Sequence, residues 1–203
     1  MAEKYNMSFT TGGLFRQEAE ILAGLYMESN NWDDSKNKVL KDNLFQVTTQ
    51  SALKRILREI LGRIKLLGEK QLEILVDGTP HEKQHILWLA ACKRFDFIRE
   101  FAVEVLREHY LQQVKELCTN DFDQFFRNKA EWHEELSSLT DATKDKLRYV
   151  VFKMMREAEL ISNKNEILPA VLSYRTVQAI NSENDEDVLV FPISESELRE
   201  WAV

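Results

Sequence analysis

One amphipathic stretch constrains this chain more than any other, and it lies at residues 48–67 (TTQSALKRILREILGRIKLL). Its apolar residues recur every three or four positions, as one face of an α-helix requires. They are Leu53, Ile56, Leu57, Ile60, Leu61 and Ile64. Thr48 or Thr49 can cap the first turn, and Gly68 can follow the last. We therefore expect a helix that packs against the protein by one side.

A flank of the same helix carries cations. Lys54, Arg58 and Lys65 fall together beside the apolar arc, and Arg55 lies further round. A helix with one packed side and one cationic side has the design of a DNA-reading helix. It is also the design of a core helix whose charges are merely solvated, and this helix taken alone favours that second interpretation.

Charge is divided unevenly along the chain. The whole sequence has a net charge of −7 and a pI of about 5.3, which is not typical of a nucleic-acid-binding protein. Residues 36–70, however, contain nine basic and three acidic side chains, a net charge of +6, whereas residues 181–203 have a net charge of −6. Such a chain can hold an anionic ligand with one part while the rest keeps it soluble.

Composition favours a mainly α-helical fold of one domain or two small ones. The chain has 203 residues, 44% of them apolar, with only 6 Gly and 3 Pro. Cys92 and Cys118 show no metal-binding spacing, so we interpret both as buried, reduced thiols. The sequence shows neither an apolar leader nor a stretch able to span a bilayer. We expect a soluble, cytoplasmic protein without a membrane partner.

The first half of the chain has a helix-turn-helix pattern. A helix at residues 14–28 is followed by a short helix at 36–44, a turn at 45–47 and the basic helix at 48–67. Thr79, Pro80 and Glu82 form a capping box that opens an almost wholly apolar helix at 81–93. We place a domain boundary at 77–79, giving an N-terminal domain 1–78 and a C-terminal domain 79–203.

The second half of the chain predicts further helices and two short strands. The helices fall at residues 95–117, 122–132, 142–161, 173–180 and 194–201. The strands fall at residues 167–172 and 188–191. Helices closed by a small β ribbon resemble a winged-helix unit. The predicted fold is therefore mainly α, with a helix-turn-helix-like N-terminal domain and a winged-helix-like C-terminal domain.

Few residues indicate catalysis. No phosphate-binding loop or serine elbow is present. Residues 81–85 (HEKQH) do match the HExxH letters of zinc proteases. The match begins in the first turn of a helix directly after Pro80, and Glu82 already serves as a cap. We therefore predict no catalytic residue, no metal site and no cofactor, and we expect a protein that is not an enzyme.

Two segments resemble the BrxA family of bacterial BREX phage-defence systems. They are residues 8–29 (SFTTGGLFRQEAEILAGLYMES) and 146–173 (KLRYVVFKMMREAELISNKNEILPAVLS). The resemblance implies a small, mainly helical protein with a NusB-like fold that binds DNA and works with other BREX proteins. It brings no catalytic motif to this chain.

With this resemblance, we predict contact with double-stranded DNA, mainly through phosphates. The predicted contact residues are Lys36, Lys38, Lys41, Gln50, Ser51, Lys54, Arg55, Arg58, Arg63 and Lys65. Gln50 and Ser51 begin the basic helix, where base edges are usually read. Arg148, Lys153, Arg156 and Lys164 offer a second, weaker patch. The alternatives are a protein-interaction scaffold of the defence complex and an RNA binder in the NusB manner.

Overall fold

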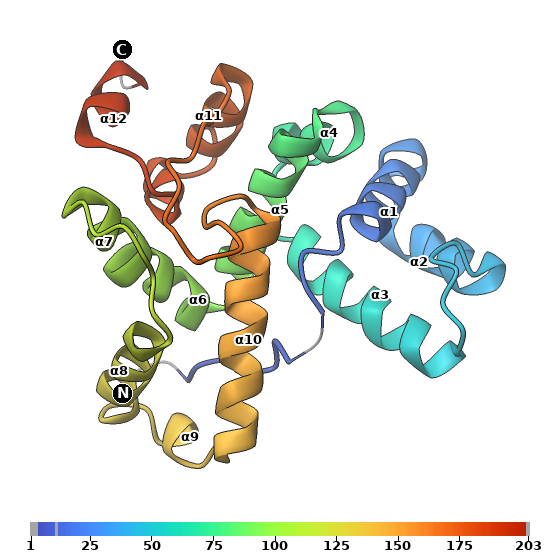
Figure 1. Ribbon diagram of the computed structural model, residues 1–203. Coiled ribbons are helices and arrows are strands. Elements are labelled where there is room, and N and C mark those ends of the chain that lie inside the picture. The colour runs from blue at the N-terminus through green and yellow to red at the C-terminus, as the bar shows by residue number, and fades with distance from the viewer. Residues whose placement is uncertain (1–3, 11, 202–203) are drawn as a thin grey trace.

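The computed structural model describes residues 4–10 and 12–201, and these residues are mainly helical (Figure 1). The elements in chain order are α1 (Arg16–Ser29), α2 (Trp32–Asp42), α3 (Gln50–Ile64), α4 (Glu69–Asp77), α5 (Pro80–Arg94), α6 (Asp96–Phe101), the π-helical η1 (Ala102–Arg107), α7 (Glu108–Leu111), α8 (Thr119–Ala130), α9 (Glu134–Ser137), α10 (Asp141–Glu157), α11 (Tyr174–Asn181), the 3-10 helix η2 (Asp185–Val190) and α12 (Glu195–Trp201). The predicted mainly α fold is confirmed. No helix within these residues combines the length and apolar character needed to cross a bilayer.

Helix α5 lies at the centre because apolar side chains cover nearly its whole circumference. Every residue from His85 to Cys92 is buried, and a helix that is apolar all round has to be enclosed by others. Helices α3, α4, α6, α10 and α11 pack against it. The indole N–H of Trp88 donates to the Val190 carbonyl at 2.9 Å, which joins η2 to α5. The capping box predicted at Thr79 is present.

Helices α1, α2 and α3 form a three-helix unit on the side of the molecule away from α12 (Figure 1). The Asn31 side chain accepts from the Asp33 amide at 2.9 Å, so α2 begins before the predicted Lys36. Thr49 Oγ1 accepts from the Ala52 amide at 3.3 Å, which confirms one of the two predicted caps of α3. The apolar arc of α3 is turned inward, with Leu53, Leu57, Ile60 and Ile64 buried.

The predicted β ribbon is wrong. Residues 188–191 lie in η2 and directly after it, and within the described residues 167–172 make only an isolated bridge between Ile161 and Ile167. The Ala170 amide donates to the Pro192 carbonyl, but the neighbouring residues do not continue that pairing into a ladder. A short apolar run signals burial without fixing the backbone, and here the buried Val190 ends the 3-10 helix η2 while the buried Phe191 follows it in an extended conformation. The prediction of a winged-helix-like C-terminal part depended on this ribbon and is therefore not supported.

The long helix predicted at 95–117 is also interrupted. Its middle, η1, is π-helical, and α7 ends at Leu111. The aromatic residues of α8 face the beginning of this region, since the Phe97 ring lies 5.7 Å from Phe122 and 5.1 Å from Phe125 between centroids. These aromatic residues are buried and form core.

An extended strap, residues 4–10 and 12–15, runs from α8 and α9 past α10 to the start of α1 (Figure 1). Phe9 is fully buried, 5.2 Å from the Phe95 ring, and the Tyr5 amide donates to Glu135 at 2.6 Å. Buried apolar side chains from both sides of residues 77–79 join in one cluster. The division into domains 1–78 and 79–203 stays a prediction.

Candidate nucleic-acid interface

Helices α2 and α3 bring basic and apolar residues together around one groove. Lys36 and Leu40 come from consecutive turns of α2, and Lys54, Leu57, Arg58 and Leu61 come from consecutive turns of α3. Residues three or four apart lie on the same helix face. The groove has a volume of about 460 Å³. Its floor is leucine and its rim is cationic. The cationic flank was predicted, but the groove was not.

Seven of the predicted basic residues are exposed on this unit. They are Lys36, Lys38, Lys41, Lys54, Arg55, Arg58 and Lys65. None of the seven forms an ion pair with any side chain of residues 4–10 and 12–201. The Lys65 ammonium lies 5.9 Å from the centroid of the Trp32 ring, which stacks on Tyr26 at 3.8 Å. We call the first six of these residues the α2–α3 cationic face; of them Lys36, Lys54 and Arg58 line the groove, and Lys38, Lys41 and Arg55 lie elsewhere on the same two helices.

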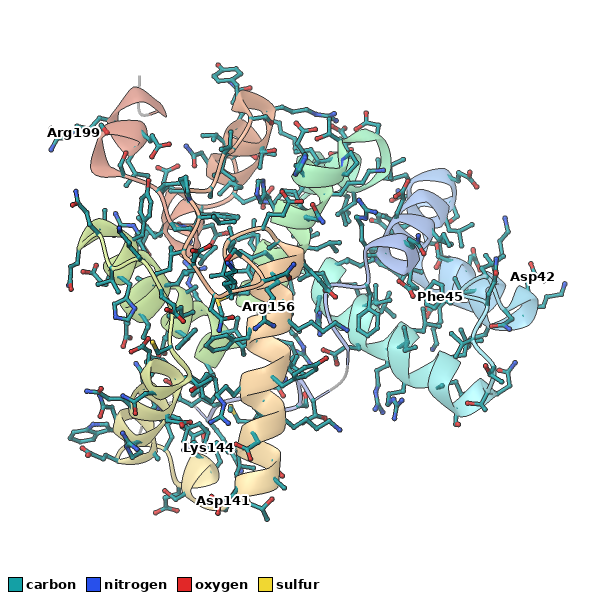
Figure 2. All side chains as sticks on the ribbon, viewed as in Figure 1. Asp42, Phe45, Asp141, Lys144, Arg156 and Arg199 are labelled. Atoms are coloured by element: carbon teal, nitrogen blue, oxygen red, sulfur yellow. The ribbon has the colours of Figure 1, made fainter. Side chains whose placement is uncertain are left out.

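Many cations elsewhere are neutralised by the protein itself. Asp187, which is buried, accepts from Arg99 at 2.7 Å and lies 3.0 Å from Lys93. Asp123 does the same for Arg148 at 2.7 Å and for Lys144 at 3.4 Å. Figure 2 shows how widely the basic and acidic side chains are spread over the molecule, with Asp42 and Phe45 marking the α2 end and Arg199 the opposite edge.

The second predicted patch is largely paired within the protein. Arg148 is bound by carboxylates, Lys153 lies 3.7 Å from Glu157, and Arg156 donates to the Asn165 side chain at 2.7 Å. Lys164 is exposed and makes no ion pair with the described residues. Fewer cations of this second patch than of the α2–α3 cationic face are therefore free of partners within the described residues and able to bind an anionic ligand.

Arg63 does not belong to the exposed set, and its predicted role in contacting DNA is corrected here. Only 3% of its side chain is exposed. Its guanidinium donates to the Gly13 carbonyl at 2.8 Å and twice to Glu59 Oε1, at 3.0 and 2.7 Å. Burial lowers the pKa of Arg63, and the Glu59 carboxylate opposes that shift. Arg63 lies on the inward-facing side of α3. The buried side of the helix is wider there than the spacing of its leucines and isoleucines indicates.

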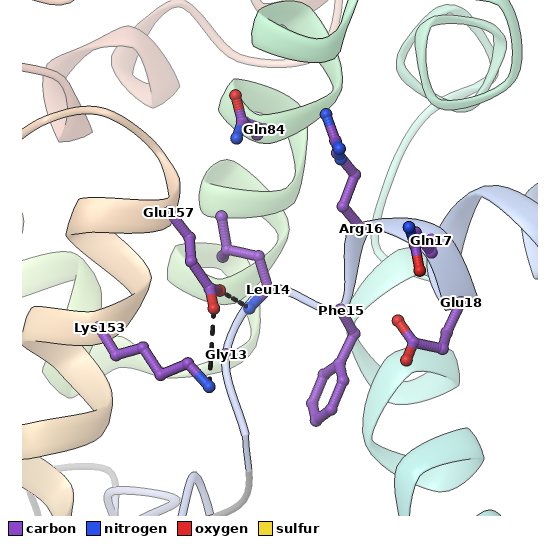
Figure 3. Close-up of a pocket in the computed structure, with 9 residues that line it drawn as sticks. All are labelled: Gly13, Leu14, Phe15, Arg16, Gln17, Glu18, Gln84, Lys153 and Glu157. Carbon is purple, nitrogen blue, oxygen red and sulfur yellow. Dashed lines mark hydrogen bonds and ion pairs between the residues drawn. The ribbon is translucent and has the colours of Figure 1, made fainter. Parts of the chain in front are cut away.

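Arg63 on α3 and Glu157 on α10 hold the strap between these two helices. Glu157 accepts from the Leu14 amide at 2.5 Å (Figure 3). The approach is so close that a Cβ on Gly13 would lie 2.1 Å from the Glu157 carboxylate. A pocket of about 340 Å³ remains beside this junction, lined by residues of the strap, α1, α5 and α10. The strap therefore fixes the position of α3 relative to α10.

Gln50 and Ser51 occupy the exposed first turn of α3. The Ser51 hydroxyl lies 3.3 Å from that of Thr49, and the Gln50 side chain is turned to solvent. Both residues are placed where a ligand lying along α3 would meet them. Their reading of base edges stays a prediction.

The HExxH residues each have a different structural environment. His81 is exposed and its Nδ1 lies 2.8 Å from Glu159. Glu82 caps α5 and also accepts from the Ser173 hydroxyl at 2.6 Å, which lowers the pKa of Glu82. His85 is buried, its ring meets Phe191 edge-on, and burial lowers its pKa to about 4. Over the part of the chain that the structure describes, no three His, Cys, Asp or Glu side chains gather as metal ligands would.

The fold and the site together define a mainly helical protein in which two adjacent helices present basic side chains that have no carboxylate partner among the described residues. A model of the BrxA family matches residues 3–184, and the chain belongs to this family, as its resemblance predicted. The BREX protein BrxA of Bacillus cereus (strain H3081.97) is 30% identical over 161 residues, covering 76% of this chain and 80% of that protein. The BREX protein BrxA of Paramagnetospirillum magneticum (strain ATCC 700264 / AMB-1) is 23% identical over 192 residues, covering 94% and 96%.

A solved structure shares this fold. It is the crystal structure of an uncharacterized protein from Magnetospirillum magneticum, with a TM-score of 0.80 and 20% sequence identity. The match covers 94% of this chain and 99% of the other. The arrangement of helices therefore extends over nearly the full length of both proteins.

Proposed function

We propose that this BrxA-family protein is a non-catalytic DNA-binding component of a BREX phage-defence system. It contacts double-stranded DNA through the α2–α3 cationic face, mainly at phosphates. The observation that carries the proposal is the set of six exposed basic side chains on two adjacent helices, without carboxylate partners among the described residues. Membership in the BrxA family and the naming of its relatives as BREX proteins support the setting.

Unpaired cations suit phosphate binding for an energetic reason. A cation already paired with a carboxylate must lose that partner before it can contact DNA, whereas a solvated one only displaces water and counterions. Each phosphate neutralised releases condensed counterions, so binding depends steeply on salt and little on sequence. Gln50 and Ser51, at the start of α3, are the candidates for contacts to base edges.

The α2–α3 face is also tied firmly to the rest of the protein. Arg63 on α3, which pairs with Glu59 of the same helix, donates to the Gly13 carbonyl of the strap, and the Leu14 amide of the strap donates to Glu157 on α10. DNA bound on α3 would therefore contact a helix whose position is fixed relative to α10. The remainder of the surface, which is acidic overall, stays available for other BREX proteins.

Binding to labelled duplex DNA, single-stranded DNA and RNA over a salt series tests the proposal. The variant is Lys54→Glu/Arg55→Glu/Arg58→Glu. The matched control is Lys115→Glu/Arg127→Glu/Arg199→Glu, which makes the same charge change at exposed residues outside both predicted patches, none of them ion-paired among the described residues. We expect duplex binding that is lost in the first variant and kept in the control, with both variants folded.

Other outcomes of this experiment separate the alternatives. A preference for single-stranded RNA would indicate RNA binding in the NusB manner. Equal loss in both variants would show that total charge, rather than the α2–α3 face, governs binding. No binding to any nucleic acid near physiological salt would refute the proposal and leave the protein-interaction scaffold.

A further inference from the structure

The groove between α2 and α3 has a floor that phosphate binding does not require. Leu40, Leu57 and Leu61 form this floor, and Leu40 and Leu61 are each only partly buried. Lys36, Lys54 and Arg58 stand around them. A phosphodiester backbone is satisfied by the rim alone, so it leaves the leucines in contact with water. Leucine exposed in a concave site is a feature typical of binding an apolar group.

The cations of the rim restrict the charge of a ligand that carries this apolar group. Three cations without carboxylate partners among the described residues surround the leucines, so an apolar ligand that carries positive charge would be repelled. A segment with apolar side chains on one face and carboxylates beside them satisfies both parts of the groove. An acidic amphipathic helix has this arrangement, because its anchors at i, i+3, i+4 and i+7 form one stripe.

We infer that the α2–α3 groove binds an acidic amphipathic segment of a partner protein. Its apolar side chains occupy the floor at Leu40 and Leu61, and its carboxylates pair with Lys36, Lys54 and Arg58. The volume of about 460 Å³ is of the size that holds a few side chains rather than a whole domain. The rest of the segment lies along the groove and contacts solvent.

The inference has a consequence for the proposed function. The same three cations belong to the α2–α3 cationic face, so the segment and DNA cannot occupy them together. A partner that docks in the groove therefore displaces DNA, and DNA blocks the partner. The two ligands differ in one respect only, since the segment depends on the leucine floor and DNA does not.

The probe for the test is a synthetic helical peptide with leucines at i, i+3, i+4 and i+7 and glutamates on both flanks. A second peptide has the same glutamates and alanine in place of every leucine. We expect the leucine peptide to bind the wild-type protein at least about tenfold more tightly, because burying even one leucine gives about that factor. It should also displace labelled duplex DNA, whereas the alanine peptide should not.

A protein variant separates the floor from the rim. Leu40→Gln/Leu61→Gln makes the floor polar at two partly exposed residues while leaving every cation in place. We expect it to lose the preference for the leucine peptide and to keep its affinity for duplex DNA. Equal binding of the two peptides to the wild-type protein would overturn the inference, and this comparison does not depend on the folding of any variant. Preference for the leucine peptide in a protein that binds no DNA would refute the proposed function and keep the inference.

Discussion

Arg58 and Arg63 lie on the same helix, and the structure predicts opposite consequences for the same substitution at the two positions. Arg58 is exposed on the groove rim without a carboxylate partner among the described residues, whereas Arg63 is buried and donates to Gly13 and Glu59. Arg63→Met keeps the apolar stem but removes three hydrogen bonds and leaves Glu59 and the Gly13 carbonyl unpaired. Breaking one side of a buried charged contact costs about 3–5 kcal/mol.

For a chain of this size, a loss of that magnitude lowers the melting temperature by roughly 10 °C. Arg58→Met should change the unfolding free energy by no more than about 0.5 kcal/mol, as exposed substitutions usually do. Arg58→Met should instead reduce the salt slope of duplex DNA binding by about 1. Arg63→Met should leave that slope unchanged at temperatures where the variant is folded.

Thermal and urea unfolding give the change in stability of each variant. DNA binding at several salt concentrations gives the salt slope of each variant. The reasoning is refuted if Arg63→Met is as stable as the wild-type protein and weakens DNA binding as much as Arg58→Met does. That result would mean that the Arg63 guanidinium is available to the ligand in solution.

Three further predictions concern the core. Burial lowers the pKa of His85 to about 4, so the unfolded chain binds a proton there more readily. Stability should therefore fall as the pH drops from about 6.5 to about 4, by up to roughly 3 kcal/mol, and urea titrations of His85→Leu should show a weaker dependence in that range. Asp187→Asn should lower the unfolding free energy by about 3 kcal/mol, because Arg99 loses a buried carboxylate partner; an unchanged urea midpoint would contradict this. Burial raises the pKa of Cys92, so a thiol reagent should modify the exposed Cys118 rapidly in the native protein and Cys92 only after denaturation.

Local sequence signals predicted the helical elements well. The caps at Thr49 and Thr79 and the inward face of α3 follow from hydroxyl chemistry and from helical periodicity, and both are properties of neighbouring residues. The all-apolar pattern of α5 likewise indicated its central place. These features could be predicted because they do not depend on distant parts of the chain.

The wrong predictions concern segments whose backbone conformation or burial depends on contacts with distant parts of the chain. Residues 188–191 are all apolar and two of them are β-branched, and their wrong assignment as a strand follows from that composition, whereas in the structure Asp185–Val190 form η2 and the Val190 carbonyl accepts from the distant Trp88 indole. Cys118, expected to be buried, is exposed at the start of α8. Neither outcome has a local signal.

The candidate site was predicted in part. The exposed cations of α2 and α3 could be found from helical spacing, but their freedom from carboxylate partners depends on where every acidic residue lies in the fold. The burial of Arg63 could not be predicted from neighbouring residues, because its guanidinium donates to the carbonyl of Gly13, fifty positions away in the sequence. The leucine floor of the groove required the relative placement of two helices.

The salt dependence of duplex DNA binding tests the central claim most directly. If the six residues of the α2–α3 cationic face neutralise phosphates, log K should fall with log salt at a slope of about −5. In Lys54→Gln/Arg55→Gln/Arg58→Gln the slope should be about −3, and in the matched control Lys115→Gln/Arg127→Gln/Arg199→Gln it should stay near −5. Between about 50 and 200 mM salt, the wild-type protein should lose roughly a thousandfold in affinity and the first variant only about sixtyfold. Identical slopes for all three folded proteins would contradict the claim that this face holds DNA.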